Sequence, residues 1–188
     1  YITVPSLSLL AGTSLFLIGL ASVSTADDRV CRGSIGGVTV DDNVVVRSNK
    51  RCTLNGTTVK GNVTVQRNAR LVANGVRVEG NIQAKRSRQV VIQRGSEVDG
   101  DIQVERGSAT TVSASLIRGN IQLKTNAGRQ RILNNVVDGD VQLFSNRGRA
   151  EVRRNRIDGN LQCKSNRPAP IGSANLVDGN KENQCRRF

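Results

Sequence analysis

The chain has 188 residues, which suits a single domain, and only 2% of them are aromatic, with no tryptophan. A core without large rings must be narrow and filled by valine, isoleucine and leucine, which disfavours a thick sandwich of sheets. The formal net charge of +13 attracts anionic partners or surfaces. The chain has no histidine, so the commonest general base and metal ligand is excluded.

Residues 1–26 carry no charge, contain the apolar run Leu15-Phe16-Leu17-Ile18-Gly19-Leu20, and end in Ser24-Thr25-Ala26. Small residues at Ser24 and Ala26 match the positions that signal peptidase reads. We therefore expect a leader helix that exports the rest of the chain and is then cleaved. The alternative is a retained membrane anchor, because the run approaches the roughly 20 residues that span a bilayer.

A seven-residue segment, Val137-Asp138-Gly139-Asp140-Val141-Gln142-Leu143, recurs along most of the remaining sequence. Its central glycine has counterparts at Gly61, Gly80, Gly100, Gly119, Gly159 and Gly179, and Asp42 occupies the same place one step earlier. The interval is always nineteen or twenty residues. A period of this length predicts a solenoid, in which each repeat buries the apolar face of its neighbour.

Within each repeat, apolar residues alternate on either side of the glycine with the spacing of a strand, as in Val98, Ile102 and Val104. A second apolar position precedes each glycine by seven to nine residues, at Leu54, Leu71, Ile92, Val112, Ile132, Val152 and Ile171. Each coil is therefore expected to contain at least two strands with inward side chains. A left-handed hexapeptide helix fits less well, because the inward intervals do not repeat every six residues.

Polar residues also recur at fixed phase, and we interpret them as turn residues. Asparagine or aspartate follows the glycine throughout, and a second asparagine lies further downstream at Asn49, Asn68, Asn126, Asn146 and Asn166. Glycine adopts unusual φ values and asparagine tolerates them, and stacked asparagines could form amide ladders. An outward column, interpreted as a solvated ladder or a saccharide-contacting face, contains Thr64, Gln83, Gln103, Gln122, Gln142 and Gln162.

These coils resemble those of right-handed parallel β-helices. The segment Val98-Asp99-Gly100-Asp101-Ile102-Gln103-Val104 is similar to the coils of bactofilins, and the asparagine columns are similar to the ladders of pectate-lyase-like proteins. The resemblance covers residues 38–180 and implies the architecture rather than an activity. Bactofilins are cytoplasmic, unlike a chain with an export leader. Residues 159–185 also resemble the ends of uncharacterised secreted bacterial proteins.

Four cysteines form two sequence pairs, Cys31 with Cys52 and Cys163 with Cys185, each separated by about one coil. Coils stack about 4.8 Å apart, which lies within the Cα range of a disulfide, and export favours oxidation. We predict that each pair forms a disulfide at one end of the solenoid. A metal site is not expected, because the cysteines lack the C-x-x-C spacing of zinc sites and there is no histidine.

An acidic column precedes the glycines at Asp99, Asp138, Asp158 and Asp178, with Asp101 and Asp140 two residues further on. Carboxylates about 5 Å apart occur in retaining glycosidases, so a small polysaccharide lyase or glycosidase is the alternative function. However, a column repeated on every coil is typical of turn chemistry, whereas an active site is local. Because Arg118 also interrupts the column, we predict no catalytic residue and no cofactor.

Basic residues gather after the downstream asparagine phase, and stacking would bring them into a stripe. We predict that Arg129, Arg131, Arg147, Arg149, Lys164 and Arg167 form an anion-binding surface. Stacked like charges repel and destabilise the fold, and the chain does not need so many of them on one edge to be soluble. The alternative to a binding surface is an edge that is only solvated. Nucleic acid is a weaker candidate ligand than an acidic or cell-surface glycan, because interleaved aromatics for base stacking are missing.

The sequence thus predicts an all-β, right-handed parallel β-helix of about eight coils of 19–20 residues. We expect a leader at 1–26, an N-terminal cap at 27–37, the β-helix at 38–180 and a C-terminal cap at 181–188. The predicted function is an exported, non-enzymatic module, secreted or at the cell surface, that binds an anionic polymer and has no membrane contact once the leader is removed. A self-assembling filament is a further alternative, but we expect a monomer, because a cysteine-containing segment at one end and a polar segment at the other would close the solenoid.

Mass analysis of the exported product is expected to place Asp27 at its N-terminus, because the residues that signal peptidase reads lie directly before it. A product that keeps residues 15–20 in the membrane would identify the leader as an anchor instead.

Overall fold

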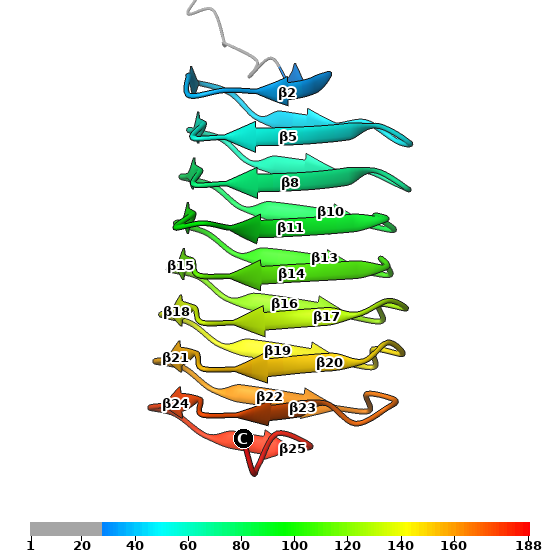
Figure 1. Ribbon diagram of the computed structural model, residues 1–188, viewed down its shortest axis with the longest axis vertical. Coiled ribbons are helices and arrows are strands. Elements are labelled where there is room, and N and C mark those ends of the chain that lie inside the picture. Colours follow the sequence, from blue (N-terminus) through cyan, green and yellow to red (C-terminus); the bar gives the residue numbers. More distant parts are fainter. Residues whose placement is uncertain (1–27) are drawn as a thin grey trace, which may run out of the picture.

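The computed structural model describes residues 28–188, and the predicted leader at 1–26 lies outside them. The described chain is a right-handed β-solenoid of eight coils, each contributing one strand to each of three parallel sheets (Figure 1). In Figure 1 the front strands run leftward and the rear strands rightward while the chain descends, which gives the right-handed sense. The predicted all-β fold class and coil length are therefore confirmed.

Sheet A contains nine strands, which lie at the back of the molecule in Figure 1. They are β1 (Arg29–Val30), β4 (Val44–Val46), β7 (Val63–Val65), β10 (Ile82–Lys85), β13 (Ile102–Glu105), β16 (Ile121–Lys124), β19 (Val141–Phe144), β22 (Leu161–Lys164) and β25 (Lys181–Asn183).

Sheet B contains eight strands, which face the viewer in Figure 1. They are β2 (Gly33–Ile35), β5 (Arg51–Asn55), β8 (Arg70–Asn74), β11 (Gln89–Gln93), β14 (Ala109–Ser113), β17 (Gln130–Leu133), β20 (Ala150–Arg153) and β23 (Ile171–Ser173).

Sheet C contains eight two-residue strands along the left edge of Figure 1. They are β3 (Thr39–Val40), β6 (Thr58–Val59), β9 (Arg77–Val78), β12 (Glu97–Val98), β15 (Leu116–Ile117), β18 (Val136–Val137), β21 (Arg156–Ile157) and β24 (Leu176–Val177).

The first coil begins earlier in the chain than the sequence repeat indicates. Strands β1 and β2 lie within residues 27–37, where a separate cap is expected, and they pair in parallel with β4 and β5. At the other end β25 adds a strand beneath β22, so the solenoid also extends past residue 180. Strands β1 and β2 lack the glycine motif, so the sequence period does not reveal them, whereas β25 follows Gly179 as β22 follows Gly159.

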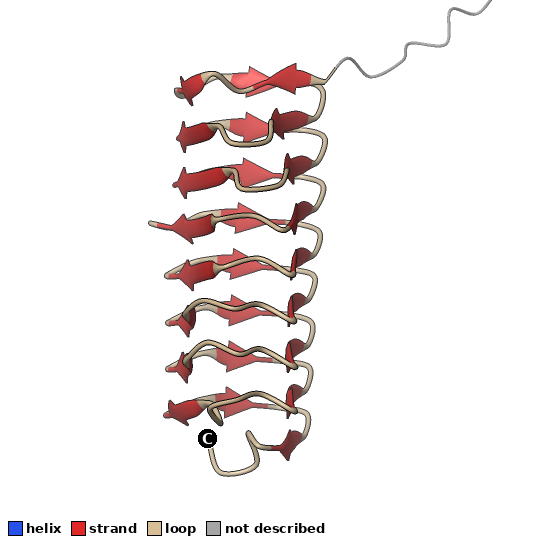
Figure 2. Cartoon of the chain, turned by 90° about the vertical axis from the view of Figure 1, so that its right-hand side faces the viewer, coloured by secondary structure: helices blue, strands red, loops and turns tan. Residues whose placement is uncertain are grey.

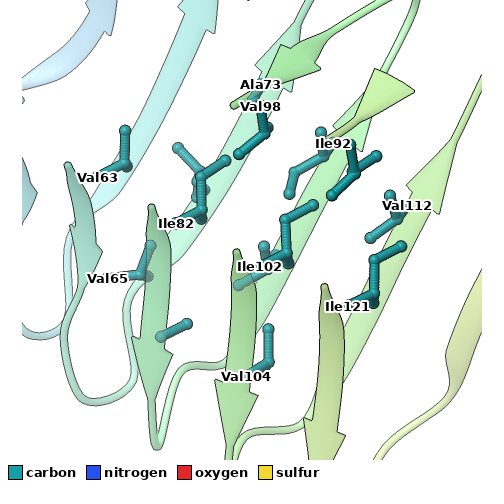
Figure 3. Close-up of a cluster of buried hydrophobic side chains, with 14 of the residues drawn as sticks. Val63, Val65, Ala73, Ile82, Ile92, Val98, Ile102, Val104, Val112 and Ile121 are labelled. Carbon is teal, nitrogen blue, oxygen red and sulfur yellow. The ribbon is translucent and has the colours of Figure 1, made fainter. Parts of the chain in front are cut away.

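The core is a column of stacked aliphatic side chains (Figure 3). In one coil Ile82 and Ala84 point inward from sheet A, Ile92 from sheet B and Val98 from sheet C, and all are buried. Each is in register with an apolar residue of the next coil, for example Ile82 with Ile102. A fully buried aliphatic side chain contributes about 1.5–3 kcal/mol through removal from water, so this narrow core needs no aromatic ring.

The second apolar position is inward in most coils, but the expectation for Ile171 is wrong. Ile171 is 43% exposed, because it pairs with the outward Glu151, and Gly172 takes the inward place opposite Val152. The space left by the missing side chain is filled by Phe188, whose ring lies so close to Gly172 that a Cβ there would meet it at 2.3 Å. The C-terminal segment thereby covers this part of the core.

The repeated glycine is required by close packing rather than by an unusual φ. None of Gly61, Gly80 and Gly100 has a positive φ, but a Cβ on Gly100 would lie 2.7 Å from the Gly80 carbonyl oxygen and 2.4 Å from Asn81 Oδ1. The positive-φ glycines form another column, which includes Gly56 and Gly75. Each repeated glycine thus allows its coil to sit directly on the glycine of the coil before it.

Asparagine ladders connect the coils, but the downstream column divides into two classes. Asn49 and Asn68 are exposed and have positive φ values of 65° and 56°. Asn126, Asn146 and Asn166 are buried, and the Nδ2 of Asn146 donates to Leu123 O at 2.8 Å and to Asn166 Oδ1 at 2.9 Å. A further buried ladder joins Asn135, Asn155 and Asn175.

Both predicted disulfides are present, Cys31 with Cys52 and Cys163 with Cys185. They lie at opposite ends of the core, and all four residues are buried. Sequence separations of 21 and 22 residues correspond to about 3 kcal/mol of stabilisation each in the chain-entropy model. Each disulfide fastens a terminal coil that has a neighbour on one side only.

Replacing Asn146 by Ala is expected to lower the free energy of unfolding by about 3 kcal/mol, because several buried polar groups lose their partners. Chemical denaturation of Asn146→Ala beside Gln142→Ala tests this expectation. Gln142 belongs to an outward ladder, so its loss should cost less than about 1 kcal/mol. Equal destabilisation by the two variants would show that burial of the ladder is unimportant.

Candidate functional site

Positive charge gathers where the chain turns from sheet A to sheet B, and we call this edge the A–B corner. It is the right-hand edge of Figure 1 and faces the viewer in Figure 2. Within residues 28–188 its only acidic side chain is Glu105. Its cations are Arg32, Arg47, Lys50, Arg51, Arg67, Arg70, Lys85, Arg86, Arg88, Arg106, Lys124, Arg129, Arg147, Arg149, Lys164 and Arg167.

Five of the six predicted binding residues lie at this corner, in the last three of its turns. Arg129 and Arg149 occupy equivalent places in consecutive coils, joined by the bond from Gln130 N to Arg149 O. Arg147 and Arg167 form a second stacked pair, and Lys164 ends β22 beside them. All five side chains are exposed. A groove of about 500 Å³ runs over these turns, lined by Arg147 and Arg167 and by the hydroxyl residues Thr125, Ser145 and Ser165.

The sixth predicted residue, Arg131, lies elsewhere. It belongs to β17, on the outer face of sheet B, and its Nε is 3.7 Å from Glu151 Oε2. Glu151 also pairs with Arg153 at 3.0 Å. The sequence pattern groups Arg131 with Arg129 because they are two residues apart, but the strand begins between them and carries Arg131 away from the corner.

The corner is equally basic in coils that the sequence analysis did not single out. Arg51 and Arg70 are register partners on β5 and β8, and Arg88 lies at the start of the next strand of the same sheet. Burial, together with the charges of Arg88 and Arg51, lowers the pKa of the Arg70 guanidinium. No carboxylate lies within 4.0 Å of these three side chains in the described part of the chain, so their mutual repulsion is uncompensated.

Sequence reasoning also missed Phe144, which points outward from sheet A at the corner. It lies between Lys124 of β16 and Lys164 of β22 in the strand register and is partly exposed. Its signal is visible in the sequence, since Leu143 is inward and strand alternation turns the next residue outward. The ring can lie against the aliphatic stems of the flanking lysines.

The predicted acidic column lies beside sheet C, away from the basic corner, and its members form ion pairs with arginines. Arg118 Nε is 3.2 Å from Asp99 Oδ1, and its Nη1 is 3.9 Å from Asp138 Oδ2. Arg156 bridges Asp158 at 3.3 Å and Asp178 at 3.5 Å. These pairs are largely exposed, and each such pair contributes at most about 1 kcal/mol.

Glu97 is the centre of the strongest cluster on this sheet. Its carboxylate accepts hydrogen bonds from Arg118 Nη2 at 2.8 Å and Arg77 Nη1 at 2.7 Å. The hydrogen bond from Arg118, with the positive charge of Arg77 nearby, lowers the pKa of Glu97 below its ordinary value of 4.5. The same contacts raise the pKa of Arg118. Arginines on or next to sheet C thus compensate Glu97 and the acidic column.

Asp101 and Asp140 act as ladder residues rather than as members of an acidic pair. The Oδ1 of Asp101 accepts the backbone N–H of Asn120 at 2.7 Å, and Asp140 accepts that of Asn160 at 2.7 Å. Asn120 separates the two carboxylates, donating its own backbone and side-chain groups to one and accepting the backbone N–H of the other. Asp101 and Asp140 therefore do not form the pair of facing carboxylates that a glycosidase needs on either side of its substrate.

Within residues 28–188 there is no cluster of three or more His, Cys, Asp or Glu residues that could hold a metal ion. The same residues contain no helix long and apolar enough to cross a bilayer. Comparison with protein families, with curated proteins and with solved structures finds no match to this chain. The function must therefore be argued from the chain's own surfaces.

Removal of the Glu97 charge should change the acid sensitivity of the fold. A lowered pKa in the folded state contributes stability above the unfolded value of 4.5, and this contribution is lost as pH falls through the folded value. Glu97→Gln should therefore be less stable than the wild type at pH 7, by no more than about 1 kcal/mol, and the difference should vanish in acid.

The matched control is Glu79→Gln, which removes an exposed carboxylate near sheet C that has no ion-pair partner within 4.0 Å in the described chain. Thermal melting of the three proteins between pH 7 and pH 3 measures both effects. A constant gap between the wild type and Glu97→Gln at every pH would contradict the proposed pKa shift.

Proposed function

We propose that the protein is an exported, non-enzymatic β-solenoid that acts as a rigid surface or matrix module and binds an anionic polymer through its A–B corner. Acidic glycans and cell-wall polymers are the ligand classes that we favour. The observation that carries the proposal is the contrast between two edges of one molecule. Beside sheet C, each aspartate of the acidic column lies within 4.0 Å of an arginine, whereas at the A–B corner cation follows cation and Glu105 is the only acidic side chain of that edge among residues 28–188.

This contrast matters because coils about 4.8 Å apart bring stacked charges close together. Like charges directly opposite each other on neighbouring strands are destabilising, and beside sheet C the stacked aspartates are compensated by Arg118 and Arg156. The uncompensated cations of the corner thus lower the stability of the fold, and a bound anionic ligand would relieve their repulsion. A linear polyanion along the solenoid axis would contact several coils at once.

The ion pairs and ladder bonds of the acidic residues support a structural role for them. Asp99, Asp138, Asp158 and Asp178 contact arginines, and Asp101 and Asp140 accept backbone N–H groups. This arrangement favours a binding module over a polysaccharide lyase or glycosidase.

The covalent and terminal structure supports the other parts of the proposal. Two disulfides indicate an oxidising environment outside the cytoplasm, which agrees with an export leader and a secreted or surface location. At the C-terminal end, Gln184 completes the buried ladder by accepting from Asn166 at 2.9 Å, and Phe188 packs on Gly172. A covered end favours a monomer over a filament built by end-to-end strand pairing.

Binding to heparin, used as a polyanionic probe, should be strongly salt-dependent, because contact cations release counterions from the polymer. Changing Arg129, Arg147, Arg149 and Arg167 to Gln should weaken binding by about tenfold or more. It should also reduce the slope of log K against log salt by up to about 3, by analogy with nucleic acids. Titration at several salt concentrations measures both quantities, and the melting temperature should not fall, because these side chains are exposed and their mutual repulsion is reduced.

The control variant changes Arg94, Arg154, Arg186 and Arg187 to Gln, which removes the same charge from exposed positions away from the corner. It should keep most of the affinity and of the salt slope. Equal losses in the two variants would show that net charge, not the corner, attracts the polymer. Absence of binding to any polyanion tested, or cleavage of a glycan by the wild type, would refute the proposal.

A further inference from the structure

A second groove, of about 510 Å³, lies on the outer face of sheet A next to the A–B corner, over the coils that contain β7, β10 and β13. Its floor includes Thr64, Gln83 and Gln103, which belong to the outward polar column, and its wall at the corner includes Arg67, Lys85 and Arg86. Strand alternation places Gln83 and Lys85 on one outward face of β10, and the adjoining corner turns add Arg67 and Arg86 to the same groove. In the folded protein, two amides, a hydroxyl group and three cations line one groove.

We propose that this groove is the specificity site of the corner and recognises an acidic saccharide. The amide and hydroxyl groups of the floor would bind sugar hydroxyls, while the cations of the wall would hold the carboxylate or sulfate. This inference rests on the proposed function, since it assumes that the corner binds a polyanion, and it adds which coils select the ligand and by what chemistry.

The polar groups of this floor are less engaged with one another than their equivalents further along the column. Gln83 Nε2 lies 3.5 Å from Gln103 Oε1, at the limit of a hydrogen bond. In the last coils the equivalent bond from Gln142 to Gln162 is 2.9 Å, and Gln162 continues to Glu182 at 3.2 Å. The amide of Gln83 can therefore turn to a ligand at little cost, whereas those of the last coils are occupied.

The cations of the wall are similarly unengaged. Within the described residues, no carboxylate lies within 4.0 Å of Arg67, Lys85 or Arg86, and all three side chains are exposed. Glu105 borders the groove, but it pairs with Arg106 at 3.3 Å. Guanidinium groups bind carboxylate and sulfate oxygens through paired hydrogen bonds, so Arg67 and Arg86 supply the charged half of the site.

The chemistry of the floor distinguishes an acidic saccharide from other polyanions. Amides and hydroxyls both donate and accept hydrogen bonds, which matches the hydroxyls of a sugar, whereas linear polyphosphate has no hydroxyl along its chain. No aromatic side chain lines the groove, so stacked bases find no platform there. Successive polar groups lie one coil apart, about 4.8 Å, so an extended sugar chain can meet them in order along the axis.

The test compares heparin oligosaccharide with linear polyphosphate of equal charge, each titrated into the intact protein by calorimetry. The double variant Gln83→Ala with Gln103→Ala should lose roughly tenfold in affinity for the oligosaccharide, as expected for two neutral hydrogen bonds, and less than twofold for polyphosphate. Changing Arg67 and Arg86 to Gln should weaken both. The matched control, Gln142→Ala with Gln162→Ala in the same column, should leave both affinities unchanged.

The outcomes separate this inference from the function on which it rests. If the Gln83 and Gln103 variant binds the oligosaccharide as tightly as the wild type, or loses both probes equally, the saccharide site is refuted while corner binding stands. An equal loss in the Gln142 and Gln162 control would also refute it, because the site would not be local. If the wild type binds neither probe, the proposed function itself fails. A single cooperative melting transition establishes that each variant is folded.

Discussion

Stacking of each coil directly on the one before it is the constraint on which the rest of this structure depends. Parallel strands satisfy their backbone groups only through the neighbouring coils, so every phase of the repeat must hold a residue that tolerates its equivalent about 4.8 Å away. Aliphatic residues meet this condition in the core. Asparagine meets it at the turns, because the oxygen of Asn146 accepts from Asn126 of the previous coil while its nitrogen donates to Asn166 of the next coil and to a carbonyl of the previous one. Glycine meets it where backbones touch, as Gly100 does above Gly80.

The same constraint explains the distribution of charge. A charged residue in a repeating column faces its copies, and the chain deals with this in two ways. Beside sheet C it supplies charges of opposite sign, so that Arg118 lies between Asp99 and Asp138 and Arg156 bridges Asp158 and Asp178. At the A–B corner it does not, and Arg51 and Arg70 are direct register partners. Since the fold tolerates a repulsion that it avoids elsewhere, the corner is the surface where an external partner has the most to contribute.

The two halves of the solenoid differ in how completely their turn residues are hydrogen-bonded to neighbouring coils. In the C-terminal coils, asparagines are buried at two turns, and Gln184 closes one of these ladders. In the N-terminal coils, the equivalent turns contain Thr57, Ser87 and Ser96 instead, and the exposed amides on sheet A are only loosely joined. The C-terminal coils are thus fastened by internal polar bonds, whereas the N-terminal coils leave amides and cations available at the surface. The proposed saccharide groove lies in the half with unused polar groups.

The sequence by itself determined the coil length, the inward strands, the turn columns and both disulfides, because a period of nineteen or twenty residues leaves one way to stack the apolar positions. It did not determine effects that depend on the exact end of a strand. Arg131 leaves the corner because β17 begins at Gln130, and Ile171 turns outward because Gly172 takes its inward place. Nor could it join Gln83 to Arg67, which different phases of neighbouring coils bring to one groove. The sequence period determines whether the residue at each repeat position lies in the core, at a turn or on the surface. Only the tertiary structure determines which surface side chains of neighbouring coils lie together, because their distances are not encoded in the sequence spacing.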